Sequence, residues 1–390
     1  MNTLIYLSLI LFSGIVFGRL VKQAKLPNVT GYLLAGLILG PCILKLFPAE
    51  LIENLSIISE IALGLIAFSI GSSFKWDYLK KVGKIPIVIT VLEALFAVVF
   101  VVGGMLVAGY ELPFALCLGS IAAATAPAAT IMVIRQYNAK GPVTDTLLTV
   151  VAMDDAAALI LFGIAVGVAQ ILESTFTGSM FSFVLKPILE IVMALAIGLA
   201  LGAVFSYILR WFKKDGNRLI LTLAFVFAGI GISSLLNISA LLTCMAIGAS
   251  LVNVSTNANS IFKITDQFTP PIFLMFFVIS GAELDITVLP TIGLVGIIYV
   301  IMRVLGKMAG SYIGAVCTKA PVTVKKYLGP TLIPQAGVAI GLSLVATTVV
   351  PQYAATIRPV LLSATFIYEI IGPVATKLSL RKAGEIVTEG

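Results

Sequence analysis

Residues 143–170 read VTDTLLTVVAMDDAAALILFGIAVGVAQ, an apolar run interrupted by two adjacent carboxylates, Asp154 and Asp155. The run is long enough to cross a bilayer as one helix, and it places Asp154 roughly 16 Å from its start, near the middle. Two carboxylates at that depth are costly unless they face water, a cation or a basic partner. Two neighbouring acids also cannot both stay ionised at low cost, so one of them should exchange protons near neutral pH. The stretch therefore predicts a membrane helix that carries an ion- and proton-binding site.

The composition of the whole chain supports a membrane protein. Of its 390 residues, 59% are hydrophobic and 11% are charged, and the mean hydropathy is +1.11. The alternating strands of a barrel are absent, so an all-α polytopic protein is predicted. The net charge of +7 lies in short loops between apolar runs, which argues against a nucleic-acid partner. There is no histidine, so proton handling must use carboxylates, lysine and water. The four cysteines show no metal-ligand spacing, and no cofactor is expected.

Apolar runs along the chain predict thirteen spans. They cover residues 3–20, 28–47, 55–73, 85–109, 113–134, 143–170, 180–211, 217–236, 238–254, 270–288, 290–317, 328–350 and 355–380. Most of the 25 Lys and Arg residues then fall in alternate loops, on one side of the membrane. Basic loops face the cytoplasm, so the amino terminus is predicted outside and the carboxyl terminus inside a bacterial or archaeal-type plasma (inner) membrane.

The two halves of the sequence repeat. With a shift of about 210 residues, similar segments align in three pairs: 33–40 with 241–248, 67–71 with 277–281, and 125–127 with 335–337. Spans one to six then match spans eight to thirteen, and span seven is a linker helix. Matching spans are offset by seven, an odd number, so the two copies enter the membrane from opposite sides. Two inverted six-helix repeats place a substrate site where they meet, near the midplane.

Prolines interrupt two spans at equivalent positions of the repeats. Pro127 follows Thr125 in span five, and Pro334 precedes Gln335 and Gly337 in span twelve. Proline removes a backbone donor and clashes with the preceding turn, so both helices should break. Carbonyls freed at membrane depth survive only where they line a cavity or bind something. Two interrupted, crossing helices therefore point to the binding site.

Span eleven contains two cations on one helix face, Arg303 and Lys307. Lys307 is about ten residues, or roughly 15 Å, from the cytoplasmic end, too deep for snorkelling. Both cations need anionic partners, and the candidates are Glu93, Glu369, Asp154 and Asp155. We predict that Lys307 pairs functionally with the aspartates, and that Arg303 forms a structural ion pair with Glu93 or Glu369.

The motifs now described resemble those of the monovalent cation/proton antiporter superfamily. The matching residues are LPNVTGYLLAGLILGP (26–41), TAPAAT (125–130), Asp154-Asp155, Lys307 and PQAGVA (334–339). The nearer resemblance is to the bacterial sodium/proton antiporter branch that also includes the potassium-efflux systems. It covers nearly the whole chain.

The resemblance implies a homodimer built from two kinds of domain. Dimer scaffold is expected at 1–80 and 216–289, the transport core at 81–172 and 290–390, and the linker helix at 173–215. Asp155 is then the principal ion and proton carrier, and Asp154 pairs with Lys307. An Asp-Asp pair resembles the electrogenic members. Some relatives carry a carboxylate where this chain has Ala126, so Na⁺ ligands besides the two aspartates would be Thr125 and backbone carbonyls.

These observations predict an antiporter that exchanges Na⁺ (or Li⁺ or K⁺) for H⁺, with both ions competing for Asp155. The alternatives are a K⁺/H⁺ antiporter of the same branch, a sodium-coupled organic-anion symporter, a cation channel and an intramembrane enzyme. A symporter should place more polar side chains around the crossing. An enzyme is disfavoured because adjacent residues on a helix point about 100° apart and cannot clamp one bond.

Overall fold

The computed structural model describes residues 2–24, 26–76, 83–172, 180–283, 293–335, 338–339, 342–343, 346 and 350–386. All regular elements among these residues are helices. The chain divides into two compact units. Unit 1 comprises Met1–Val16, Leu34–Gly83 and Ile188–Glu283, and unit 2 comprises Phe17–Leu33, Lys84–Pro187 and Leu284–Gly390.

Unit 1 contains the middle third of the chain and part of the amino-terminal region. Its elements are the first part of α1 (Thr3–Gln23), the end of α2 (Asn28–Leu39), α3 (Ala49–Asn54), α4 (Ser56–Gly71), η1 (Ser72–Phe74), most of α10 (Met180–Ile208), α11 (Asp215–Leu236), α12 (Ala240–Val254), α13 (Ala258–Phe268) and α14 (Pro270–Glu283). Helix α4 packs on α12. Their backbones approach closely, because a Cβ at Gly248 would meet the Phe68 carbonyl and one at Gly71 would meet the Met245 carbonyl. Small residues at such crossings are the usual means of packing membrane helices.

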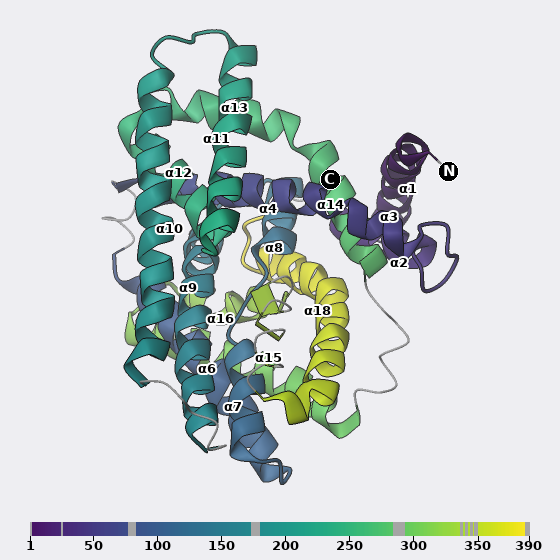
Figure 1. The fold of residues 1–390 in the computed structure, drawn as a ribbon, viewed down its shortest axis with the longest axis vertical. Helices are drawn as coiled ribbons and strands as arrows, with labels where there is room; N and C mark the ends of the chain where they lie inside the picture. Colours follow the sequence, from purple (N-terminus) through teal and green to yellow (C-terminus); the bar gives the residue numbers. More distant parts are fainter. Residues whose placement is uncertain are drawn as a thin grey trace. The chain divides into compact units, whose positions relative to one another are not determined.

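Unit 2 contains the acidic and basic residues of the predicted site. Its elements are the end of α1, the start of α2, α6 (Ile85–Val107), α7 (Leu112–Ile121), α8 (Pro127–Gln136), α9 (Pro142–Leu172), α15 (Gly293–Cys317), α16 (Val322–Tyr327), η3 (Gly329–Leu332), η4 (Pro351–Tyr353) and α18 (Ala354–Lys382). Its hydrophobic core is formed by α6, α7, α9, α15 and α18, which are drawn in Figure 1.

Helices α6 and α15 pack along a stripe of three glycines, Gly306, Gly310 and Gly314, spaced four residues apart. A Cβ at Gly310 would lie 2.6 Å from the Glu93 Cα, and one at Gly306 would lie 2.8 Å from the Ala97 Cα. No side chain fits between the two backbones there. The stripe therefore brings the polar residues of both helices within reach of one another.

Seven of the described helices are long and apolar enough to cross a membrane. An eighth span is obtained when α13 and α14, which are bent by 52° at their junction, are taken together. Four further apolar helices in the described part are shorter, namely α2, α4, α7 and α12. The chain is an all-helical, polytopic membrane protein, as its composition predicted.

Three described helices, α3, α13 and α16, lie where the apolar runs of the sequence predict loops. Helix α13 carries Lys263 and Asp266, polar residues typical of a connection. Its apolar side chains recur at helical spacing, and Ile261, Phe262 and Thr265 are buried. An amphipathic helix that covers a core has this pattern, and a hydropathy average conceals it.

Candidate functional site

Helix α9 carries the two aspartates into the interior of unit 2, where it packs against α6 and α7. Asp154 has no exposed surface, and Asp155 is 7% exposed. Successive residues on a helix differ in direction by about 100°, so the two carboxylates face different neighbours. The pair therefore offers two distinct environments from one turn of helix.

The helix of span five is broken between α7 and α8. Residues 122–126 are non-helical, and Ala126 is extended, with φ −86° and ψ 114°. Pro127 begins α8, where its missing N–H costs no hydrogen bond. In the second interrupted segment, residues 333–335 are also non-helical. Ala126 N donates to Pro334 O over 2.9 Å. The two irregular segments are thus joined directly through their backbones.

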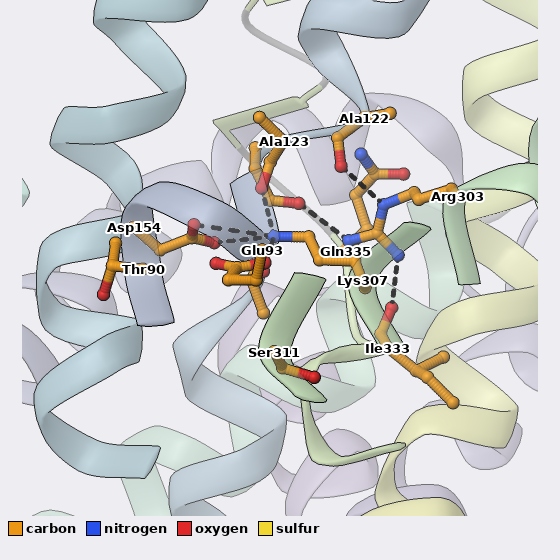
Figure 2. Close-up of polar contacts among 12 residues, drawn as sticks. Thr90, Glu93, Ala122, Ala123, Asp154, Arg303, Lys307, Ser311, Ile333 and Gln335 are labelled. Atoms are coloured by element: carbon orange, nitrogen blue, oxygen red, sulfur yellow. Dashed lines mark hydrogen bonds and ion pairs between the residues drawn. The ribbon is translucent and has the colours of Figure 1, made fainter. Parts of the chain in front are cut away.

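Arg303 binds the carbonyl groups that these two segments leave without helical partners. Its Nε donates to Ala122 O (3.0 Å), Nη2 to Ala124 O (2.7 Å) and Nη1 to Ile333 O (2.7 Å). The guanidinium also lies 4.6 Å from the centre of the Tyr368 ring. The planar fork of five N–H groups suits several carbonyls at once. Figure 2 shows Arg303 between Ala122 and Ile333.

The prediction that Arg303 pairs with Glu93 or Glu369 is wrong. Arg303 makes no ion pair with either carboxylate; Glu93 pairs with Lys307 over 2.6 Å instead. Glu369 is buried on α18, in a place that Arg303 does not contact. The physical reason is that the broken helices present backbone acceptors at membrane depth, and these acceptors need donors as much as a carboxylate needs a cation.

Gln335 and Tyr299 form a second link across the break. Gln335 Nε2 donates to Ile121 O over 3.0 Å, and Tyr299 OH donates to Gln335 Oε1 over 3.1 Å. Both side chains have no exposed surface. Gln335, predicted to take part in ion binding, thus has its amide oxygen and nitrogen engaged with protein groups.

Lys307 is the centre of the polar cluster. Its Nζ lies 2.6 Å from Glu93 Oε2, 3.2 Å from Asp154 Oδ2 and 2.8 Å from Thr125 Oγ1, and it also donates to Ala123 O. Four acceptors thus surround an ammonium that has three N–H groups. Figure 2 shows the Lys307 nitrogen facing Asp154, Glu93 and the Ala123 carbonyl. Asp154, Thr125 and Lys307, which the sequence assigned to one site, are in contact.

Asp155 keeps an oxygen available next to this cluster. Its Oδ1 is buried, and no described residue donates a hydrogen bond to it. A carboxylate oxygen in that situation can take a proton or a cation. Gly337, the third residue predicted at the breaks with Pro127 and Pro334, lies outside the described residues.

The involvement of Glu93 at Lys307 and of Tyr299 at Gln335 was not predicted from the sequence. A usable signal for Glu93 was present, because glycines at 306, 310 and 314 mark a face of α15 that must pack closely on another helix. Lys307 lies one position from Gly306 and therefore near that contact.

Residues 7–382 match the model of the family described as "Sodium/hydrogen exchanger, transmembrane". The chain belongs to this sodium/hydrogen exchanger family. The family is one of membrane transporters, so the resemblance inferred from the sequence motifs is confirmed, as is the prediction that the chain is not an enzyme.

Individual proteins named as Na(+)/H(+) antiporters are similar to the chain at about one quarter identity or less. Na(+)/H(+) antiporter NhaS4 of Synechocystis sp. is 25% identical over 339 residues, which is 80% of each chain. Na(+)/H(+) antiporter 1 of Methanocaldococcus jannaschii is 26% identical over 215 residues, 52% of this chain and 47% of that one. The solved sodium proton antiporter MjNhaP1 from the same organism superposes with a TM-score of 0.78 at 19% identity, covering 100% of both chains. The exchanger therefore has the fold of MjNhaP1.

Proposed function

We propose that this exchanger moves Na⁺ against H⁺ and that the two ions compete for Asp155. The observation that carries the proposal is the buried Asp155 oxygen to which no described residue donates a hydrogen bond, beside a broken helix and the Lys307–Asp154 pair. Family membership supports the choice of ions. The alternatives of an organic-anion symporter and a channel have no such support.

In the proton-loaded state, Asp155 carries a proton and Asp154 pairs with Lys307. In the cation-loaded state, Asp154 and Asp155 both face the cation, and Thr125 and backbone carbonyls complete its shell. Hard oxygen ligands of this kind suit Na⁺. Asp155 cannot hold both ions, so arrival of one expels the other.

The exchange is proposed to be electrogenic, with more than one proton released for each cation. Asp155 supplies one proton. The second comes from the buried cluster of Glu93, Asp154 and Lys307, in which two carboxylates lie within ion-pair distance of one ammonium. Moving uncompensated charge through an apolar barrier is costly, so only a loaded site crosses, and this couples the two fluxes.

The architecture we propose is thirteen spans in two inverted repeats. Close contacts in unit 1 support it. A Cβ at Gly36 of α2 would meet the Val278 carbonyl of α14, and a Cβ at Gly248 of α12 would meet the Phe68 carbonyl of α4. The repeat relates α2 to α12 and α4 to α14, so the two contacts join equivalent pairs of helices. Inverted repeats supply the two access states of a carrier.

We further propose that the chain works as a homodimer by a rigid-body, elevator-type movement. Residues 1–80 and 216–289 would be the dimer scaffold, and residues 81–172 and 290–390 the core that moves against it. The basic bias of alternate loops supports an outer amino terminus and a cytoplasmic carboxyl terminus.

The first test is Asp155→Asn in proteoliposomes, with exchange driven by a pH gradient. The amide cannot carry the proton or the charge, so Na⁺ exchange is expected to be abolished. Asp145→Asn is the matched control, because Asp145 is an exposed aspartate in the first turn of the same helix. Undiminished exchange by Asp155→Asn would reject the assignment. Currents on a supported membrane after Na⁺, Li⁺ and K⁺ jumps identify the cation and measure electrogenicity together.

A further inference from the structure

Two carboxylates from different helices share the Lys307 ammonium. Glu93 of α6 is the nearer, at 2.6 Å, and Asp154 of α9 lies at 3.2 Å. All three side chains have no exposed surface. A lysine that served Asp154 alone would not need the second carboxylate, and burying a further charge has a cost.

Lys307 is the cationic partner of Glu93: the ammonium lies 2.6 Å from Glu93 Oε2 as an ion pair. No described group makes a hydrogen bond to either oxygen of Glu93. Its position is fixed by the glycine stripe, because the backbone of α15 at Gly310 rests on the Glu93 Cα. Lys307 is three residues before Gly310 on α15. The distance between Glu93 and the root of Lys307 is therefore set by backbone packing.

Asp154 is placed differently, because its helix α9 also carries Asp155. In the proposed exchange, Asp154 has to leave Lys307 in order to face the cation. If Asp154 were the sole counter-charge, cation binding would strand a buried ammonium, and the cost of the unpaired charge would oppose binding. A second carboxylate in contact with the same nitrogen removes that cost.

We propose that Glu93 is a positioning residue for cation binding: it holds Lys307 whenever Asp154 turns to the cation. This inference rests on the proposed exchange of Na⁺ for H⁺ at the aspartate pair. Glu93 does not contact the cation. It acts by competing with Asp154 for the ammonium, which leaves the Asp154 carboxylate free for Na⁺.

Glu93→Gln tests the inference by removing the charge while keeping the shape. Lys307 is then paired with Asp154 alone, and Na⁺ has to displace it without compensation. The apparent KM for Na⁺ is expected to rise about tenfold, because the buried ammonium loses one of its two carboxylate partners, with a much smaller change in kcat. Glu93→Asp retains the charge and should restore KM toward the wild-type value. The measurement is the Na⁺ dependence of exchange in proteoliposomes at one fixed pH.

The same substitution in a Lys307→Ala background separates this role from a structural one. Without the ammonium, Glu93 and Asp154 have no shared cation to compete for. Glu93→Gln should then leave KM unchanged or lower it. A purely structural role for Glu93 predicts impairment in both backgrounds. Glu369→Gln is the matched control, because it neutralises another buried glutamate of unit 2 that does not contact Lys307, and its KM should equal that of the wild type.

Two failures are distinguishable. If the wild-type protein exchanges no Na⁺, the proposed function itself is wrong. If the wild type exchanges Na⁺ but Glu93→Gln leaves KM unchanged, or raises it equally in the Lys307→Ala background, the role of Glu93 is refuted while the exchange function stands.

Discussion

At the scale of single residues, Arg303 and Lys307 lie one helical turn apart and do different work. Arg303 is committed to neutral carbonyls of the two broken segments, whereas Lys307 is surrounded by carboxylates and a hydroxyl. The guanidinium keeps its charge under all conditions and binds several acceptors in a fixed plane. The ammonium is a compact charge that can change partners. A structural cation and an exchangeable one thus share a helix face.

Arg303→Lys is expected to destabilise the protein even though the charge is kept. A lysine amine cannot span carbonyls on both segments, so at least one buried acceptor loses its donor, at a cost of about 1–3 kcal/mol. Thermal unfolding in detergent, followed by intrinsic fluorescence, measures the loss. Arg381→Lys, at the exposed end of α18, is the control and should leave stability unchanged. Wild-type stability of Arg303→Lys would show that the carbonyl contacts contribute little.

The contact of Lys307 with Asp154 could be predicted from the sequence because a buried cation at that depth needs an anion. The partner of Arg303 could not. Counting charged residues takes no account of backbone acceptors, and these appear only once the helices have broken. Glu93 was recognised as buried, but its partner depended on which helix packs on α6, and the sequence alone did not identify that helix.

At the scale of elements, α9 is held at its first turn by the far end of the chain. The Glu385 carboxylate accepts from Val143 N (2.6 Å), Thr144 N (2.7 Å) and Thr144 Oγ1 (2.6 Å). Lys140 N also donates to Glu385 O over 3.0 Å. A carboxylate at a helix amino terminus accepts from unpaired N–H groups and interacts favourably with the positive end of the helix dipole. The segment after α18 thereby fixes the helix that carries both aspartates.

Glu385→Ala is expected to loosen the first turn of α9, with a loss of about 1–2 kcal/mol of local stability. Hydrogen–deuterium exchange of peptides covering residues 143–150 should become faster. Glu385→Gln keeps one acceptor oxygen and should give an intermediate effect. Glu53→Ala, at an exposed position of α3, is the control. Unchanged exchange of the α9 peptides in Glu385→Ala would contradict the capping role.

Most of the membrane helices could be predicted from apolar run length, because a helix in lipid has to be uniformly apolar. Helix α13 was missed since it is amphipathic and carries Lys263 and Asp266. The break before Pro127 could be predicted from the missing N–H of proline. Its extent, residues 122–126, could not, because it depends on hydrogen bonds to Arg303 and Pro334 that lie far away in sequence.

At the scale of the whole molecule, competition for one carboxylate fixes how exchange depends on pH. Lowering the pH raises proton occupancy of Asp155 and so raises the apparent KM for Na⁺, by up to about tenfold per pH unit for this one proton and more steeply where the second proposed proton is also displaced. Saturating Na⁺ should recover the full rate. Initial rates over a matrix of Na⁺ concentrations and pH values test this. A falling maximal rate at constant KM would instead indicate inactivation at a separate site.

The glycine stripe between α6 and α15 has a consequence for selectivity between ions. Because no side chains lie between α6 and α15 at the stripe, the spacing of the two backbones beside Glu93 and Lys307 cannot adjust to the size of a bound ion. The two irregular segments, residues 122–126 and 333–335, are held together by the Arg303 guanidinium and by the hydrogen bond from Ala126 N to Pro334 O. The space left for a dehydrated alkali ion therefore depends on Arg303, although Arg303 does not have to contact the ion.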